Sequence, residues 1–164
     1  MVMTVWYLHG LESSQGGPKV EFLNKVAENV FAPEMNYQDG NLFAELLSKA
    51  KAERPDLIIG SSMGGYFADA LGSNLGVEVL LFNPALHSRR IEPAGVVFGN
   101  SVYKRHFVVG SEDTVIDPKL TKVLAEPNAT FIVKEGMGHR TSLIVFVDIY
   151  NKLFSESVII NLSE

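Results

Sequence analysis

Ser62 lies at the centre of the motif Gly60-Ser61-Ser62-Met63-Gly64, which reads G-x-S-x-G. The motif directly follows an apolar run typical of a strand and directly precedes a helical pattern. A nucleophile elbow requires this order, because its serine occupies a strained turn between a strand and a helix that cross closely. Ser62 is preferred to Ser61, since only Ser62 has a glycine two places away on both sides. The alternative is a glycine-rich turn without chemistry.

A serine hydroxyl needs a base to accept its proton, and a histidine held by a carboxylate often has that role. His139 follows a strand-like run and a glycine-rich turn, and precedes the last helical pattern. Asp113 follows an earlier strand-like run. Asp117 precedes Pro118, a pair that suits a helix N-cap and first turn, so it already has a structural explanation. Asp113 is therefore the preferred acid, with Asp117 and Glu112 as alternatives.

Acyl transfer passes through a tetrahedral oxyanion, which backbone N–H groups usually stabilise. One donor is expected to be Met63, the residue after the nucleophile, and the other a residue in the loop after the first strand. That loop contains His9-Gly10, and we predict the N–H of Leu11 as the second donor. The residues predicted to shape or line the substrate site are His9, Gly10, Tyr7, Tyr66, Asn83 and Leu86. No metal ligand is predicted.

The elements that position these residues alternate between strand-like and helical patterns. Six mostly apolar runs predict strands buried on both faces of a parallel sheet; they are 4–9, 31–36, 57–61, 77–82, 106–110 and 130–134. Stretches with a 3.6-residue period predict the helices 18–30, 42–53, 63–73, 118–125 and 142–154. This alternation favours an open, doubly wound α/β fold. The tail 157–164 has no assignment.

Composition narrows the class of protein. The 164 residues predict one domain, 1–164, and the net charge of −5 argues against nucleic acid or anionic membranes as main partners. Short basic runs such as Arg89-Arg90 are interpreted as surface charges. The absence of cysteine excludes disulfides and a cysteine nucleophile. No basic leader and no apolar stretch near about 20 residues is found, so we expect a cytoplasmic protein without a membrane partner.

Three segments together resemble a known family: residues 7–10 with Ser13-Ser14, residues 59–66, and Phe82-Asn83-Pro84-Ala85. They resemble the α/β-hydrolase superfamily, in particular the small bacterial esterase family typified by YqiA. The resemblance covers nearly the whole chain and is strongest over its first two-thirds. It implies a mostly parallel six-stranded sheet with helices on both faces, and hydrolysis of short-chain acyl esters or thioesters without a cofactor. In chain-order numbering the expected strand order is 2-1-3-4-5-6.

The chain departs from this family between Asn83-Pro84-Ala85 and the strand before Asp113. Members usually carry a longer insertion there, whereas this chain has only residues 87–104. Lids are commonly placed at this point of the fold, so we expect a minimal lid or none. The resulting prediction is a serine carboxylesterase acting on a small acyl ester. The alternatives are a thioesterase or amidase with the same residues, or a non-catalytic ligand-binding or interaction domain.

Overall fold

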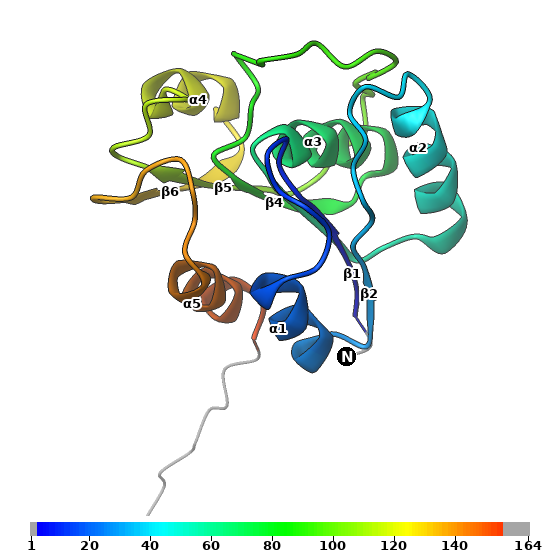
Figure 1. Cartoon of the computed structure of the whole chain (residues 1–164), viewed down its shortest axis with the longest axis horizontal. Coiled ribbons are helices and arrows are strands. Elements are labelled where there is room, and N and C mark those ends of the chain that lie inside the picture. The colour runs from blue at the N-terminus through cyan, green and yellow to red at the C-terminus, as the bar shows by residue number, and fades with distance from the viewer. Residues whose placement is uncertain (1–2, 156–164) are drawn as a thin grey trace, which may run out of the picture.

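The computed structural model describes residues 3–155, in which strands and helices alternate along the chain (Figure 1). The strands are β1 (Thr4–Leu8), β2 (Asn29–Phe31), β3 (Leu57–Ser61), β4 (Glu78–Phe82), β5 (Arg105–Gly110) and β6 (Ala129–Lys134). The helices are α1 (Pro18–Val26), α2 (Leu42–Glu53), α3 (Met63–Leu75), α4 (Pro118–Ala125) and α5 (Leu143–Phe154). The α/β prediction is confirmed, while the unassigned tail 157–164 lies outside the described residues.

The strands form one parallel sheet with the predicted order β2-β1-β3-β4-β5-β6. In the centre of the sheet, Leu8 pairs with Gly60 and Gly60 pairs with Leu81. All neighbouring pairs run in the same direction. The carboxyl ends of the strands therefore meet at one edge, which is where open α/β sheets bind ligands.

Helices cover both faces of the sheet (Figure 1): α1 and α5 lie on one face, and α2, α3 and α4 on the other. Along β1, Trp6 packs in the core on the α2 and α3 side, and Tyr7 packs in the core on the α1 and α5 side. Successive strand residues point to opposite faces, so two covered faces require continuously apolar strands. No helix within residues 3–155 is long and apolar enough to cross a membrane.

The second strand was predicted wrongly over 31–36, because β2 lies nearer the N-terminus. The backbone N–H of Asn29 donates to the carbonyl oxygen of Met3 at 3.3 Å, which draws this segment into the sheet. The preceding helix, predicted over 18–30, is shortened for the same reason. Pro33 has no backbone N–H to donate to a neighbouring strand, so the ladder does not extend through the predicted range.

The segment between β4 and β5 carries no helix or strand. It is held against α3, because the N–H of Ser101 donates to the backbone oxygen of Ser73 at 2.8 Å and the N–H of Gly99 donates to the Ser73 hydroxyl at 2.9 Å. Within the described part of the chain, no helical cap therefore stands between these two strands.

Candidate active site

Ser62 sits in the turn between β3 and α3 with φ 54° and ψ −116°. Positive φ is unfavourable for a residue with a side chain and persists only where the surroundings hold it. Here the N–H of Ser62 donates to the carbonyl oxygen of Phe82 at 2.9 Å. The carbonyl oxygen of Ser62 accepts from the N–H of Ala85, also at 2.9 Å. Hydrogen bonds to the end of β4 and the residues just after it therefore hold both the N–H and the carbonyl oxygen of Ser62 in the strained turn.

The glycines beside Ser62 allow the strand and helix to cross closely. A Cβ added at Gly64 would lie 2.0 Å from the carbonyl oxygen of Leu8. A Cβ added at Gly60 would lie 2.2 Å from the carbonyl oxygen of Gly64. Both obstacles are backbone atoms, which cannot rotate away as a side chain can. Glycine at these two positions is therefore a steric requirement of the turn.

Three side chains form a continuous hydrogen-bonded chain. His139 Nε2 lies 2.9 Å from Ser62 Oγ, and His139 Nδ1 lies 2.9 Å from Asp113 Oδ2. The Asp113 side chain is fully buried, and its Oδ1 accepts from the backbone N–H groups of Val115 and Ile116 at 2.8 and 2.9 Å. With Nδ1–H donated to this carboxylate, Nε2 is left as the acceptor for the serine proton. The arrangement can therefore transfer a proton from Ser62 to His139.

The two alternative acids occupy other positions. Asp117 Oδ1 accepts from the backbone N–H of Lys119 at 2.8 Å and thereby caps α4. Glu112 is exposed to solvent. The structure thus brings Asp113 to the histidine and leaves Asp117 in the capping role that its position before a proline predicts.

The predicted oxyanion donors come from two segments, the loop after β1 and the first residue of α3. Leu11 and Met63 both line the pocket beside the serine, and among residues 3–155 no acceptor bonds to either backbone N–H. Met63 is the first residue of α3, where an N–H has no partner within the helix. A Cβ added at Gly10 would lie 3.4 Å from the Cβ of Ser62, so the loop bearing Leu11 packs directly against the serine. The two N–H groups can therefore serve an oxyanion.

His9 lies outside the pocket, contrary to the predicted substrate contact, and is almost completely buried. Its Nδ1 donates to the carbonyl oxygen of Gly10 at 2.7 Å, and its Nε2 accepts from the N–H of Met35 at 2.9 Å. The hydroxyl of Tyr37 donates to the carbonyl oxygen of His9. His9 therefore shapes the loop that carries Leu11, as was also predicted.

Asn83 also lies outside the pocket, because it is buried at the end of β4. Its Oδ1 accepts from the N–H of Gly110 at 2.9 Å, and its Nδ2 donates to the carbonyl oxygen of His139 at 2.8 Å. Its φ of 42° is one that asparagine tolerates better than most residues. The sequence predicted a substrate contact for Asn83 and missed this positioning role. The tolerance of asparagine for positive φ, at the end of a predicted strand, was the signal that could have indicated it.

Of the other predicted pocket residues, Gly10 and Tyr7 line the pocket, whereas Tyr66 and Leu86 do not. The ring of Tyr66 instead lies 4.2 Å from the guanidinium carbon of Arg89 and supports it. The expected substrate contact of Tyr66 is corrected accordingly. The cause is the path of the segment after β4, which packs Arg89, a residue that lines the pocket, against this ring.

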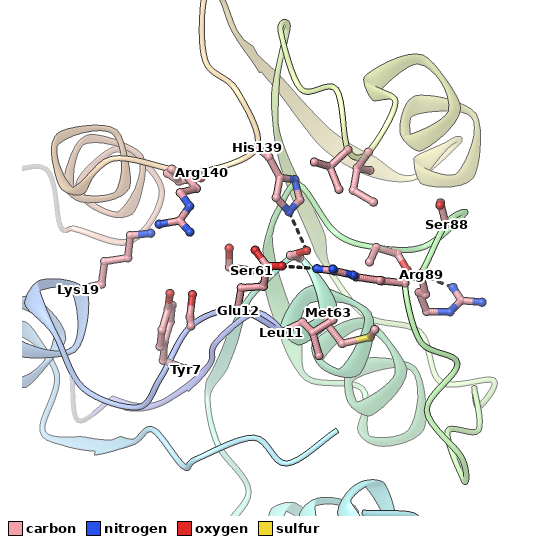
Figure 2. A pocket seen from close by; sticks show the side chains of 18 residues that line it. Tyr7, Leu11, Glu12, Lys19, Ser61, Met63, Ser88, Arg89, His139 and Arg140 are labelled. Carbon is pink, nitrogen blue, oxygen red and sulfur yellow. Dashed lines mark hydrogen bonds and ion pairs between the residues drawn. The ribbon is translucent and has the colours of Figure 1, made fainter. Parts of the chain in front are cut away.

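The pocket, shown in Figure 2, has a volume of about 390 Å³, and Ser62 and His139 are among the residues that line it. This volume is within the range of sites for small molecules. Sequence reasoning missed its charged lining: Glu12, Lys19, Arg89, Arg90 and Arg140. Arg89 and Arg90, interpreted as surface charges, come from the segment between β4 and β5, and Arg90 forms an ion pair with Glu12. This segment therefore forms one wall of the pocket.

Burial shifts the pKa values of two ionisable groups in the pocket. Loss of solvent raises the pKa of the Tyr7 phenol to about 12, above the ordinary value of a phenol. Burial lowers the pKa of the Lys19 ammonium from its ordinary value. In the described chain, no group of three or more histidine, aspartate or glutamate side chains is arranged to hold a metal ion.

The family model of an uncharacterised protein family, UPF0227, matches residues 4–94, which include the turn at Ser62. No curated protein sequence matches the chain significantly. Solved structures match over almost its whole length. A protein of the alpha/beta hydrolase superfamily from Xanthomonas campestris pv. campestris is 20% identical with a TM-score of 0.72, covering 93% of this chain and 100% of that one.

Two further solved structures share the architecture. An alpha/beta hydrolase from a sediment metagenome of the Mar Chica lagoon, Morocco, is 14% identical with a TM-score of 0.69, covering 93% of this chain and 89% of its own. The monoacylglycerol lipase of Paleococcus ferrophilus is 14% identical with a TM-score of 0.64, covering 84% and 86%. These likenesses establish the α/β-hydrolase fold that the motifs indicate.

Proposed function

We propose that this chain, which belongs to the uncharacterised protein family UPF0227, is a serine hydrolase that cleaves small acyl esters. The observation that carries the proposal is the chain of two 2.9 Å hydrogen bonds from Asp113 through His139 to Ser62. The fold alone would not suffice, because one fold hosts unrelated functions. The strained turn at Ser62 and the N–H groups beside it support the same chemistry.

In the first step, Ser62 Oγ attacks the carbonyl carbon of the ester while His139 Nε2 accepts the hydroxyl proton. The carbonyl π electrons move to the oxygen, which becomes a tetrahedral oxyanion. The backbone N–H groups of Leu11 and Met63 donate hydrogen bonds to that oxyanion. The buried carboxylate of Asp113 holds the imidazole in place and stabilises its protonated form.

Collapse of this intermediate breaks the bond to the alcohol oxygen, which takes the proton from His139 and leaves. The acyl group is now covalently bound to Ser62. His139 then takes a proton from water as the water oxygen attacks the acyl carbon. A second collapse releases the carboxylic acid and returns the proton to Ser62 Oγ.

The decisive experiment is labelling with a fluorophosphonate probe, which reacts with activated serines, followed by peptide mass spectrometry. We expect modification of Ser62. The Ser62→Ala variant should lose the label and at least about 10⁴-fold in kcat/KM on p-nitrophenyl butyrate. The matched control is Ser61→Ala, the neighbouring hydroxyl, which should keep its label and lose less than about tenfold in rate. A folded parent protein that takes no label would contradict the proposal and favour a non-catalytic domain.

The same residues can cleave thioesters or amides, because the attack on the carbonyl is common to all three. A panel of butyryl ester, butyryl thioester and butyryl anilide substrates separates these reactions with the acyl group held constant. We expect the highest Ser62-dependent kcat/KM for the ester. A higher value for the thioester or the anilide would replace the ester assignment.

A further inference from the structure

The pocket beside Ser62 carries an excess of positive charge in an acidic protein. The chain has a net charge of −5. The charged residues that line the pocket are nevertheless mostly cationic: Lys19, Arg89, Arg90 and Arg140, against Glu12 alone. A local field opposite in sign to the whole molecule concentrates ligands of the complementary charge.

Two of these cations are already neutralised within the protein. Arg90 forms an ion pair with Glu12 across the pocket mouth. Arg89 Nε lies 2.9 Å from a carboxylate oxygen of Glu92, and its Nη1 donates to the carbonyl oxygen of Leu86 at 2.7 Å. Their charges therefore maintain the wall of the pocket, and the excess lies with the remaining two side chains.

Lys19 and Arg140 converge on one side of the pocket. Figure 2 shows their side chains, from α1 and from the residue after His139, reaching toward the same space, with the Tyr7 hydroxyl facing it. Within residues 3–155, neither cation has a carboxylate within ion-pair distance. Lys19 Nζ instead lies 5.7 Å from the ring centre of Phe146, within range of a cation–π contact.

The two cations differ in their exposure to solvent. Arg140 is exposed, whereas Lys19 is partly buried, and the loss of solvent lowers the pKa of its ammonium. Thr141, which follows Arg140 and lines the same pocket, is 6% exposed. Its hydroxyl has no hydrogen-bond partner among the described residues. An oxyanion would neutralise the cations and accept from the hydroxyl groups.

We propose that Lys19 and Arg140, assisted by the hydroxyl groups of Tyr7 and Thr141, form an anion-binding subsite for a carboxylate or phosphate group of the ester hydrolysed at Ser62. The inference rests on the proposed hydrolase function, since the subsite and the nucleophile share one pocket. It narrows the substrate class from small acyl esters to anionic ones.

The test compares esters that differ in one charge. One pair is p-nitrophenyl butyrate and the p-nitrophenyl monoester of glutaric acid, which places a carboxylate on the acyl group. The other pair is methyl 4-(butyryloxy)benzoate and 4-(butyryloxy)benzoic acid, which places it on the leaving group. In at least one pair, kcat/KM of the parent protein should favour the anionic ester by roughly tenfold.

Variants assign that preference to the subsite. Lys19→Met and Arg140→Gln should each reduce the anionic-to-neutral ratio several-fold, and the double variant should abolish the preference. Arg140→Lys, which keeps the charge, should retain part of it. The matched control is Lys51→Met, an exposed cation on α2 away from the pocket, which should leave the ratio unchanged. Thermal melts identify any variant that loses its fold.

The failures of the two proposals are distinguishable. If none of the four esters is hydrolysed in a Ser62-dependent manner, the hydrolase function itself is wrong. If Ser62-dependent hydrolysis proceeds without any charge preference, or with one that survives the double variant, the subsite is wrong. Inorganic phosphate should compete with the anionic ester. Competition by phosphate without a preference for either anionic ester would show a site for free anions and overturn the assignment to the substrate.

Discussion

The side-chain amide of Asn83 donates a hydrogen bond to the backbone oxygen of His139 at 2.8 Å, although 56 positions separate the two residues. The same side chain accepts from the N–H of Gly110 at 2.9 Å. One buried amide therefore links the ends of β4 and β5 to the loop after β6 that carries the histidine.

Replacing Asn83 with glycine should misplace His139 while tolerating the local φ of 42°. Removing a buried amide that positions an active group is expected to lower kcat by about 10 to 100-fold, with little change in KM. Stability should fall by about 2 kcal/mol, because the N–H of Gly110 is left without its acceptor. Steady-state kinetics and urea denaturation measure both effects. An unchanged kcat in the folded variant would refute the positioning role.

The assignment of the acid can be tested by two aspartates on the same loop. Asp113→Asn should lower kcat by about 10⁴-fold, because a neutral amide cannot hold the correct histidine tautomer or stabilise imidazolium. Asp117→Ala should cost about 1 kcal/mol of stability through loss of the α4 cap, with kcat nearly unchanged. Kinetics on p-nitrophenyl butyrate and thermal melts of both variants show which aspartate is the acid. The reverse pattern would make Asp117 the acid.

The crossing of β3 and α3 should tolerate no added methyl group. Gly64→Ala places a Cβ 2.0 Å from the backbone oxygen of Leu8, so we expect a loss of more than about 3 kcal/mol, or failure to fold. Gly138→Ala is the matched control, since no atom lies within 4 Å of a Cβ added there. Its stability should change by less than about 0.5 kcal/mol. Equal losses in urea denaturation would show that the close crossing is not what requires glycine.

Stability should fall at alkaline pH because the tyrosines bind their protons more tightly in the folded state. Burial raises the pKa of every tyrosine, that of Tyr7 to about 12; the five are Tyr7, Tyr37, Tyr66, Tyr103 and Tyr150. The stabilisation is complete below about pH 10, the unfolded pKa, and is lost as pH rises toward the folded values.

Absorbance titration at the phenolate band should therefore show delayed ionisation in folded protein and ordinary ionisation in urea. The free energy of unfolding should decrease as the pH rises from about 10 to about 12, and less steeply in Tyr7→Phe, which lacks one of these protons. Coincident titrations of the folded and unfolded chains would contradict this account.

Local sequence patterns were sufficient to predict the fold and the nucleophile elbow at Ser62. Apolar runs and helical periodicity predicted the order of the elements, and the glycines around Ser62 predicted the close crossing that the structure contains. The same patterns misplaced the second strand, because its position depends on the hydrogen bond from Asn29 to Met3, the residue before the neighbouring strand β1. A short strand at the sheet edge has too few residues for periodicity to locate it.

By itself, the sequence determined the alternating fold, the strained position of Ser62 and the capping role of Asp117, because each depends on residues close together along the chain. Only the tertiary structure decided that Asn83 positions the backbone of His139, and that Lys19 and Arg140 reach the same side of the pocket. Those contacts join segments that are distant in sequence, and the sheet register brings their strand ends to one edge. The charge of the pocket is therefore a property of the folded chain, opposite in sign to the net charge of its residues.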